Sequence, residues 1–379
     1  MIFHQLGFNV LLVFLLLCWN DYHVFKVEAT LTKSTPTTVG GRRNNRNSHT
    51  VDFQQSAARI MNQSSTNPIS IQRTSSSNNS DSKRRHLQST TSAITKKTQP
   101  IRIHFFTDPI EDAIAKSTNA DHKQGGQLVL DTILPAIAEE FQNTISVEPV
   151  DRLDVPNNIC DGTYSQYIPD NYMVNDSDIV IIVSSLITVV DENGNEFEWC
   201  SLSEDLTTFA AAISCGQDQS SKRPVIGLMN VCLAATANQS TSNMEEILSH
   251  ELLHVMVVSE YLFPFFRNPI TGYGMVSNPS IAQRINCVNG KDPINFYSFS
   301  PATLAYRTET VKYNFSREQR GYYEITSPTV RQVVRNQFDC QSLTGARLEN
   351  QPTNPNSCIG SHFDERFFQY NIMSALYDR

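Results

Sequence analysis

The sequence predicts an α/β fold for the second part of this 379-residue chain. Two near-continuous apolar runs, residues 178–186 (DIVIIVSSL) and 224–229 (PVIGLM), are typical of strands buried inside a sheet. Residues 127–144 carry apolar side chains at helical spacing instead. Strands and helices of this kind, alternating along one stretch of chain, together form an α/β layer.

The first residues have the features of an export signal. An uncharged start is followed by an apolar run over residues 10–19, which is too short to cross a bilayer as a helix of about 20 residues. Ala29, with Val27 two residues before it, offers a signal-peptidase site. We therefore interpret residues 1–29 as a signal peptide, with an uncleaved signal anchor as the alternative.

Residues 30–100 form a basic segment rich in Ser, Thr, Asn and Gln, with eleven Lys or Arg against two Asp. Such a composition cannot bury enough apolar surface to fold alone, which predicts a disordered pro-segment. The run Lys83-Arg84-Arg85 is either a processing site or a solvated stretch. Nucleic-acid binding is not expected, because the segment lacks interleaved aromatic residues. The whole chain has a net charge of −8, so the remainder is distinctly acidic.

Further elements follow along the folded part. Residues 101–107 and 145–150 are expected to be strands, and Pro135 is expected to kink the helix over 127–144. Ser242 to Glu245 has a capping-box pattern, which predicts the start of another helix. That helix should turn an apolar stripe toward the core, formed by Met244, Ile247, Leu248, Leu252 and Val255.

Beside this stripe lies the pattern H-E-x-x-H, formed by His250, Glu251 and His254. Two histidines at i and i+4 stand one helical turn apart on one face, where both can bind one zinc ion. A catalytic zinc needs three protein ligands and an open position, and a neighbouring carboxylate can take the proton of the zinc-activated water. The alternative interpretation is an ordinary polar helix face.

Several stretches in the same order resemble the leishmanolysin family of zinc peptidases. They are 178–183 (DIVIIV), 223–230 (RPVIGLMN), 250–266 (HELLHVMVVSEYLFPFF), 325–340 (ITSPTVRQVVRNQFDC), 342–350 (SLTGARLEN) and 360–366 (GSHFDER). The resemblance implies a metzincin-like fold, in which a twisted, mostly parallel sheet carries the active-site helix. It also implies a catalytic subdomain over 101–259, an inserted segment over 260–361, and the start of a truncated C-terminal subdomain over 362–379.

The same resemblance assigns His362 as the third zinc ligand. Met373, eleven residues later, is similar to the methionine turn that lies under the zinc in metzincins. Taken alone, His362 could be a surface histidine after a loop, and Met373 could be ordinary core filler. An Asp or Glu could also provide the third ligand, as in other zinc peptidases.

Seven of the eight cysteines lie beyond the signal peptide, and export favours disulfide bonds between them. Because seven is odd, one thiol is free, pairs with another chain or lacks its partner. The resemblance implies a Cys160–Cys215 bond, and in the family the cysteine similar to Cys340 pairs beyond the third histidine. Acceptor sequons at Asn62, Asn78, Asn175, Asn238 and Asn314 agree with export.

Val257 departs from the family, which has a glycine three residues after the second histidine. Glycine permits a sharp helix exit with positive φ, which a β-branched residue resists. The helix is therefore expected to continue toward Glu260 or Tyr261, before Pro264 ends it.

The sequence thus predicts a secreted or cell-surface zinc metalloendopeptidase. The metal is Zn²⁺, held by His250, His254 and His362, with Glu251 as general base. The partners are polypeptide substrates lying along an exposed strand edge, without nucleic acid. Association with a membrane is left open, and so is the oligomeric state. The alternative, motivated by Val257 and the early chain end, is a catalytically inactive adhesion or binding protein on the same scaffold.

Overall fold

The computed structural model describes residues 69–71 and 98–374, except 191–195, 199, 201–207, 238, 269–270, 278, 289–291, 313–316, 351–357 and 370. The predicted signal peptide, nearly all of the predicted pro-segment, four of the five sequons and residues 375–379 lie outside these residues. Within the described part, no helix has the length and apolarity that crossing a membrane requires.

Among the described residues the main sheet has five strands, and the predicted mixed α/β fold is confirmed. In spatial order these are β1 (Ile69–Ile71), β10 (Ala210–Asp218), β11 (Pro224–Val231), β7 (Ile179–Ser184) and β3 (Ile103–Phe106). β3, β7 and β11 run parallel, β10 is antiparallel to β11, and β1 adds in parallel to the end of β10. β1 lies within the segment predicted to be disordered, and pairs with Gly216 to Asp218.

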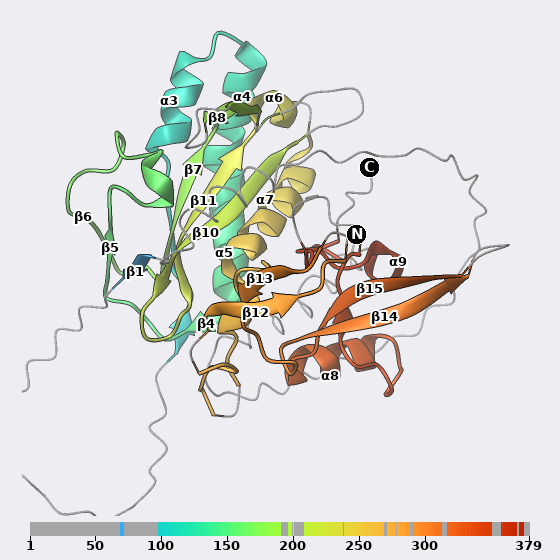
Figure 1. Ribbon diagram of the computed structural model, residues 1–379. Helices are drawn as coiled ribbons and strands as arrows, with labels where there is room; N and C mark the ends of the chain where they lie inside the picture. Colours follow the sequence, from blue (N-terminus) through green and yellow to red (C-terminus); the bar gives the residue numbers. More distant parts are fainter. Residues whose placement is uncertain are drawn as a thin grey trace, which may run out of the picture.

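Strand β7 is buried on both faces, as its apolar run predicts. Because successive side chains of a strand point to opposite faces, Ile181 packs in the core beneath the helices, whereas Ile182 packs in a second core. The second core lies under β5 (Arg152–Val155) and β6 (Tyr172–Asn175), on the other side of the sheet from α5 and α7 (Figure 1). The sheet is therefore covered on both faces.

The helix expected over 127–144 is part of a longer helical run. It consists of α4 (Ala120–Leu128), a π-helical turn (Val129–Ile133) and α5 (Leu134–Thr144), preceded by α3 (Asp108–Lys116). In the π turn the Leu134 N–H bonds to the Val129 carbonyl, five residues back. Pro135 has no N–H to give to the helix, and it lies in the first turn of α5, directly after the π turn. The kink expected at Pro135 stays a prediction.

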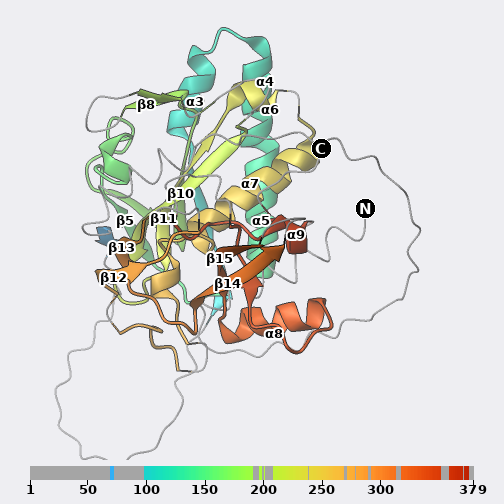
Figure 2. The ribbon, with the colours of Figure 1, turned by 45° about the vertical axis from the view of Figure 1, so that its right-hand side comes forward.

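Helix α7 (Thr241–Met256) carries the H-E-x-x-H pattern across one face of the sheet, against β10 and β11 (Figures 1 and 2). Its N-cap is Ser240 rather than Ser242, because the Ser240 hydroxyl accepts the Asn243 N–H at 3.2 Å. The predicted capping position is therefore wrong by two residues. The predicted apolar stripe is confirmed, since all five of its side chains are buried.

The prediction that α7 runs on toward Glu260 is wrong. The helix ends at Met256, and Val257 has φ −147° and ψ −54°. The N–H groups of Val257 and Val258 both bond to the Leu253 carbonyl, at 2.8 and 2.9 Å, which ends the helix with a tight turn. Because φ stays negative, a β-branched residue fits where a left-handed conformation would have required glycine.

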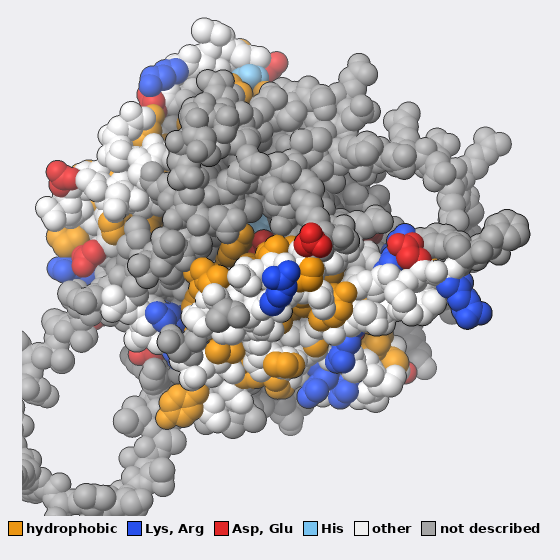
Figure 3. Space-filling view, in the orientation of Figure 1, with side chains coloured by type: hydrophobic (Ala, Val, Ile, Leu, Met, Phe, Trp, Pro, Cys, Tyr) orange, Lys and Arg blue, Asp and Glu red, His pale blue; other side chains and the backbone are white. Residues whose placement is uncertain are grey.

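The later part of the chain packs against the C-terminal end of α7. It contains β12 (Ile281–Ile285), β13 (Ile294–Tyr297), β14 (Leu304–Lys312), β15 (Arg317–Ile325), α8 (Pro328–Gln337), β16 (Ala346–Arg347) and α9 (Glu365–Phe368). β12 pairs with β13, and β14, β15 and β16 form a second antiparallel sheet. Hydrophobic side chains show on the surface over these strands, interspersed with Lys and Arg (Figure 3). Ile281 and Ile294, on β12 and β13, are exposed.

Short elements complete the described chain. They are β2 (Gln99–Pro100), β4 (Ser146–Val147), β8 (Thr188–Val190), β9 (Glu196–Glu198), α6 (Leu233–Thr236) and the 3₁₀ turns Cys160–Gly162 and Phe263–Phe265.

Three disulfides hold these parts together. Cys160–Cys215 ties the second core to β10 and confirms the pairing that the resemblance implied. Cys200–Cys232 and Cys287–Cys358 are the other two, and among the described residues Cys340 is free.

Gly227 in β11 lies close to Val255 of α7, where the helix packs on the sheet. A Cβ built there would lie 2.2 Å from Val255 Cγ1, and a valine in a helix cannot change rotamer readily. Gly227→Ala is therefore expected to lower the free energy of unfolding by about 1–3 kcal/mol, measured by chemical denaturation.

Val255→Ala provides the control, because it removes the atom that would clash. The double variant should be destabilised less than the sum of the two single variants, by at least about 0.5 kcal/mol. Strict additivity would show that this contact does not set the distance between helix and sheet.

Candidate metal centre

Three histidine side chains meet at the C-terminal half of α7. His254 Nε2 lies 3.0 Å from His250 Nε2 and 3.2 Å from His362 Nε2. Each residue offers one nitrogen, and these nitrogens all lie within 4.8 Å of one another. His250 and His254 come from α7, whereas His362 comes from a loop 108 residues after His254. The structure thus brings together the three residues that the sequence predicted as ligands.

The other ring nitrogen of each histidine is held by an oxygen atom. His250 Nδ1 bonds to the carbonyl of Ile372, and His254 Nδ1 bonds to the carbonyl of Val258 at 2.7 Å. His362 Nδ1 bonds to Glu349 Oε1 at 3.0 Å. Carbonyl oxygens only accept hydrogen bonds, so the hydrogen of His250 and of His254 is on Nδ1. The Glu349 carboxylate favours the same tautomer for His362.

This tautomer fits a metal ion. With hydrogen on Nδ1, each Nε2 presents a lone pair, and three lone pairs face one another with no donor between them. A cation at their centre removes that conflict. Tetrahedral zinc with Zn–N bonds of about 2.0–2.1 Å would place its ligand nitrogens about 3.3–3.4 Å apart, close to the two short separations found here. The donor set, three neutral imidazoles, is also one that zinc accepts.

The turn that ends α7 holds His254 in place. Because the helix stops at Met256, the chain folds back and the Val258 carbonyl points toward the ring one turn earlier. In a continuing helix that carbonyl would instead accept an N–H four residues further on. The early helix end therefore supplies an outer partner for the second histidine.

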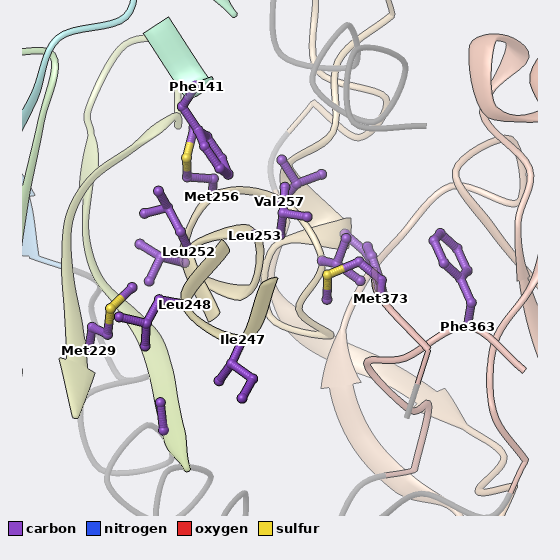
Figure 4. Close-up of a cluster of buried hydrophobic side chains, with 14 of the residues drawn as sticks. Phe141, Met229, Ile247, Leu248, Leu252, Leu253, Met256, Val257, Phe363 and Met373 are labelled. Carbon is purple, nitrogen blue, oxygen red and sulfur yellow. The ribbon is translucent and has the colours of Figure 1, made fainter. Parts of the chain in front are cut away.

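Met373 lies beside the centre and is completely buried. Asn371 to Ser374 form a turn, in which the Ser374 N–H bonds to the Asn371 carbonyl at 2.9 Å. Figure 4 shows Met373 between Leu253 and Val257 on one side and Phe363 on the other, and all four belong to the main core. The residue before it, Ile372, gives its carbonyl to His250. The turn therefore joins the core to a candidate ligand.

Glu251 is buried next to the three histidines. Burial raises the pKa of its carboxyl group to about 8, although the charge of His362 and a hydrogen bond from the Ala212 backbone oppose that shift. Ala212 belongs to β10, so Glu251 lies between the histidines and the strand next to the sheet edge. A carboxyl group with a pKa in this range can both accept and release a proton near neutral pH.

The histidines differ in how they hold protons. Burial, followed by the charge of His362, lowers the pKa of His250 to about 3, and burial also lowers the pKa of His254. Burial would lower the pKa of His362 too, but the charge and hydrogen bond of Glu349 and the charge of Glu251 raise it overall. Of the three histidines, His362 is therefore the one that takes up a proton most readily, in competition with a metal.

Sequence reasoning missed the groups that hold the ring nitrogens. The carbonyls of Val258 and Ile372 belong to turns, and a main-chain carbonyl has no sequence signal. Glu349 lies within the family-like stretch 342–350, but nothing in that stretch relates it to a histidine thirteen residues later.

Known proteins that this chain resembles carry the name leishmanolysin. Residues 303–378 match the family model described as leishmanolysin. The chain is 25% identical over 180 residues to a leishmanolysin-like peptidase of Caenorhabditis elegans, and 26% identical over 179 residues to that of Caenorhabditis briggsae. It is 25% identical over 180 residues to that of Drosophila melanogaster. These matches confirm the resemblance that the sequence predicted.

The matches are partial. Each covers 45% of this chain, and 25%, 25% and 24% of the three relatives in the same order. The matched part thus spans about a quarter of the length of these curated relatives.

A second prediction concerns metal binding and pH. The pKa of His362 is raised above 6.5, and a protonated imidazole cannot bind zinc. Zinc affinity is therefore expected to fall as the pH is lowered from about 8 to about 6, because His362 then takes up a proton. Titration against a chromophoric chelator at several pH values would measure this.

His122→Ala is the matched control, since His122 lies on α4 and should leave the profile unchanged. An affinity that stays constant across this pH range would contradict the assignment of His362.

Proposed function

We propose that this chain is a zinc metalloendopeptidase, in which His250, His254 and His362 hold Zn²⁺ and Glu251 is the general base. One observation carries the proposal: three imidazole nitrogens converge with their lone pairs facing one another, beside a buried carboxyl group. The names of the similar proteins agree with it.

Zinc supplies a Lewis acid that polarises the scissile carbonyl and activates water for attack. The protein's own contribution is to hold and move the proton. Without a metal, burial favours the protonated form of Glu251, whose pKa is about 8. Positive charge placed at the three imidazoles favours the carboxylate instead. That carboxylate can accept a proton from water and then pass it to the leaving amine.

Strand β10 offers a place for a polypeptide substrate. One side of β10 pairs with β11, and on its other side the described residues place only β1, opposite Gly216 to Asp218. The stretch around Ala212, whose backbone contacts Glu251, has no strand partner on that side within the described chain. An extended peptide could add along this edge through main-chain hydrogen bonds.

The alternative of an inactive binding protein was motivated in part by Val257. In the structure Val257 keeps a negative φ, and the histidines on either side of Glu251 still converge with His362. Glu251 itself is retained. These observations support the catalytic proposal over the binding one.

The proposed setting is outside the cell, either secreted or at the cell surface. Three disulfides support an oxidising compartment, and the sequon residue Asn175 is exposed. We further propose that residues 1–29 direct export and that residues 30–100 act as a pro-segment. We also propose a metzincin-like arrangement, in which the catalytic subdomain ends at residue 259 and the inserted segment ends at residue 361.

The third prediction tests the general base. Glu251→Ala is expected to reduce the rate of peptide hydrolysis by at least about 10²-fold, because general-base catalysis contributes about 10²–10⁴-fold. Zinc content should remain at one ion per chain, since the carboxylate does not bind the metal in this proposal. A fluorogenic peptide assay and elemental analysis would measure the two quantities on the same sample.

Glu246→Ala is the matched control, because Glu246 is an exposed carboxylate on the same helix. It should leave both quantities unchanged. Full activity in the Glu251 variant would exclude Glu251 as the base.

A further inference from the structure

Glu349 is a buried carboxylate, 3% exposed, in the segment that delivers His362. Leu348 and Phe363 form an antiparallel bridge, and the Glu349 N–H bonds to the His362 carbonyl at 2.9 Å. The backbone thus holds the two residues side by side. Gly360, with φ +89°, lets the loop pass close to Glu349, because a Cβ there would lie 2.7 Å from Glu349 Cγ.

One oxygen of Glu349 collects three hydrogen bonds. Oε1 accepts the N–H of Ser361 at 3.0 Å, the N–H of His362 at 3.2 Å, and Nδ1 of His362 at 3.0 Å. The same atom therefore fixes both the main chain and the ring of the candidate ligand. The other oxygen, Oε2, is buried and has no hydrogen-bond partner among the described residues.

Among the described residues, Lys and Arg form no ion pair with the Glu349 carboxylate. Its ion pair within the described chain is with His362, and this counts as an ion pair only when the ring is protonated. The neighbouring Arg347 pairs with Glu309 and Asp364 instead. A buried carboxylate without a compensating charge is costly, so a positive charge is expected at the far side of the imidazole.

We propose that Glu349 is the positioning residue for His362: its carboxylate orients the ring and balances the charge of a zinc ion bound at Nε2. The proposal rests on the zinc site proposed above. It adds that zinc affinity depends on a residue that does not touch the metal, because a carboxylate bonded to Nδ1 makes the imidazole a stronger ligand.

A purely structural role would have a different consequence. If Glu349 only ties the loop of Ser361 and His362, any side chain with an oxygen at the same position would serve equally well. Glutamine has such an oxygen and can keep all three hydrogen bonds to Oε1, but it has no charge. Glu349→Gln therefore separates the charge of Glu349 from its hydrogen bonds.

The experiment uses the full chain, stripped of metal with a chelator and titrated with Zn²⁺ at a fixed pH. Glu349→Gln is expected to weaken zinc binding about 10-fold, and Glu349→Ala by up to about 100-fold. The melting temperature of the metal-free Gln variant should remain that of the wild type, which shows that the loop is intact. With Co²⁺ as the probe, the visible absorption bands should shift in the Gln variant.

Glu324→Gln is the matched control. Glu324 is also buried, at 8% exposure, and pairs in register with Arg347 in the same sheet, but it bonds to Thr344 and Arg307 rather than to a histidine. This variant should bind zinc within about twofold of the wild type and keep the Co²⁺ spectrum.

Two results would overturn the proposal: a Glu349→Gln protein that binds zinc as tightly as the wild type, or an equal loss in Glu324→Gln. If the wild-type chain itself binds no zinc, the metal site fails and Glu349 loses its role with it. The wild-type titration therefore distinguishes failure of the proposed function from failure of this inference.

Discussion

The arrangement of the candidate site depends on one constraint, which is that three imidazoles must present Nε2 to a common point. Each ring achieves this only because its Nδ1 is held from behind, by Ile372, Val258 or Glu349. When all three rings are neutral, the three facing lone pairs repel one another, so the fold must supply the energy that keeps the rings together. The packing around α7 supplies it.

That packing joins distant parts of the chain into one core. The buried residues of α7 belong to the same cluster as Phe363 and Met373 from the last described segment. The disulfide Cys287–Cys358 ties that segment to an earlier loop, four residues before His362. Ordering the chain costs conformational entropy on folding. A disulfide lowers that cost, because it already restricts the unfolded chain to a closed loop. His362 therefore reaches the site on a segment that is anchored on both sides.

The edge of the main sheet gives the site its second constraint. Glu251 extends from α7 toward the Ala212 backbone, so the distance between helix and strand determines the environment of the carboxyl group. Val255 of α7 also lies close to Gly227 in β11, the strand that pairs with β10. Burial at this interface is what raises the pKa of Glu251. Proton handling in the site thus depends on how closely the helix packs on the sheet.

From the sequence alone, we could predict those elements whose residue types form a local pattern along the chain. The buried strand β7 follows from a near-continuous apolar run, whereas the apolar stripe of α7 and the His250–His254 pair follow from spacings of three and four residues. Likeness to a family supplied His362 and the Cys160–Cys215 bond, which no local period could give. Only the tertiary structure shows that α7 ends at Met256. The Val258 carbonyl after the helix bonds to His254, and the chain reversal is buried in the core. Glu349 likewise has its role only where the Leu348–Phe363 bridge forms. The hydrogen bonds of Ile372, Val258 and Glu349 with the three rings form only where turns and loops of the folded chain bring these groups together, and for this reason only the structure identified them.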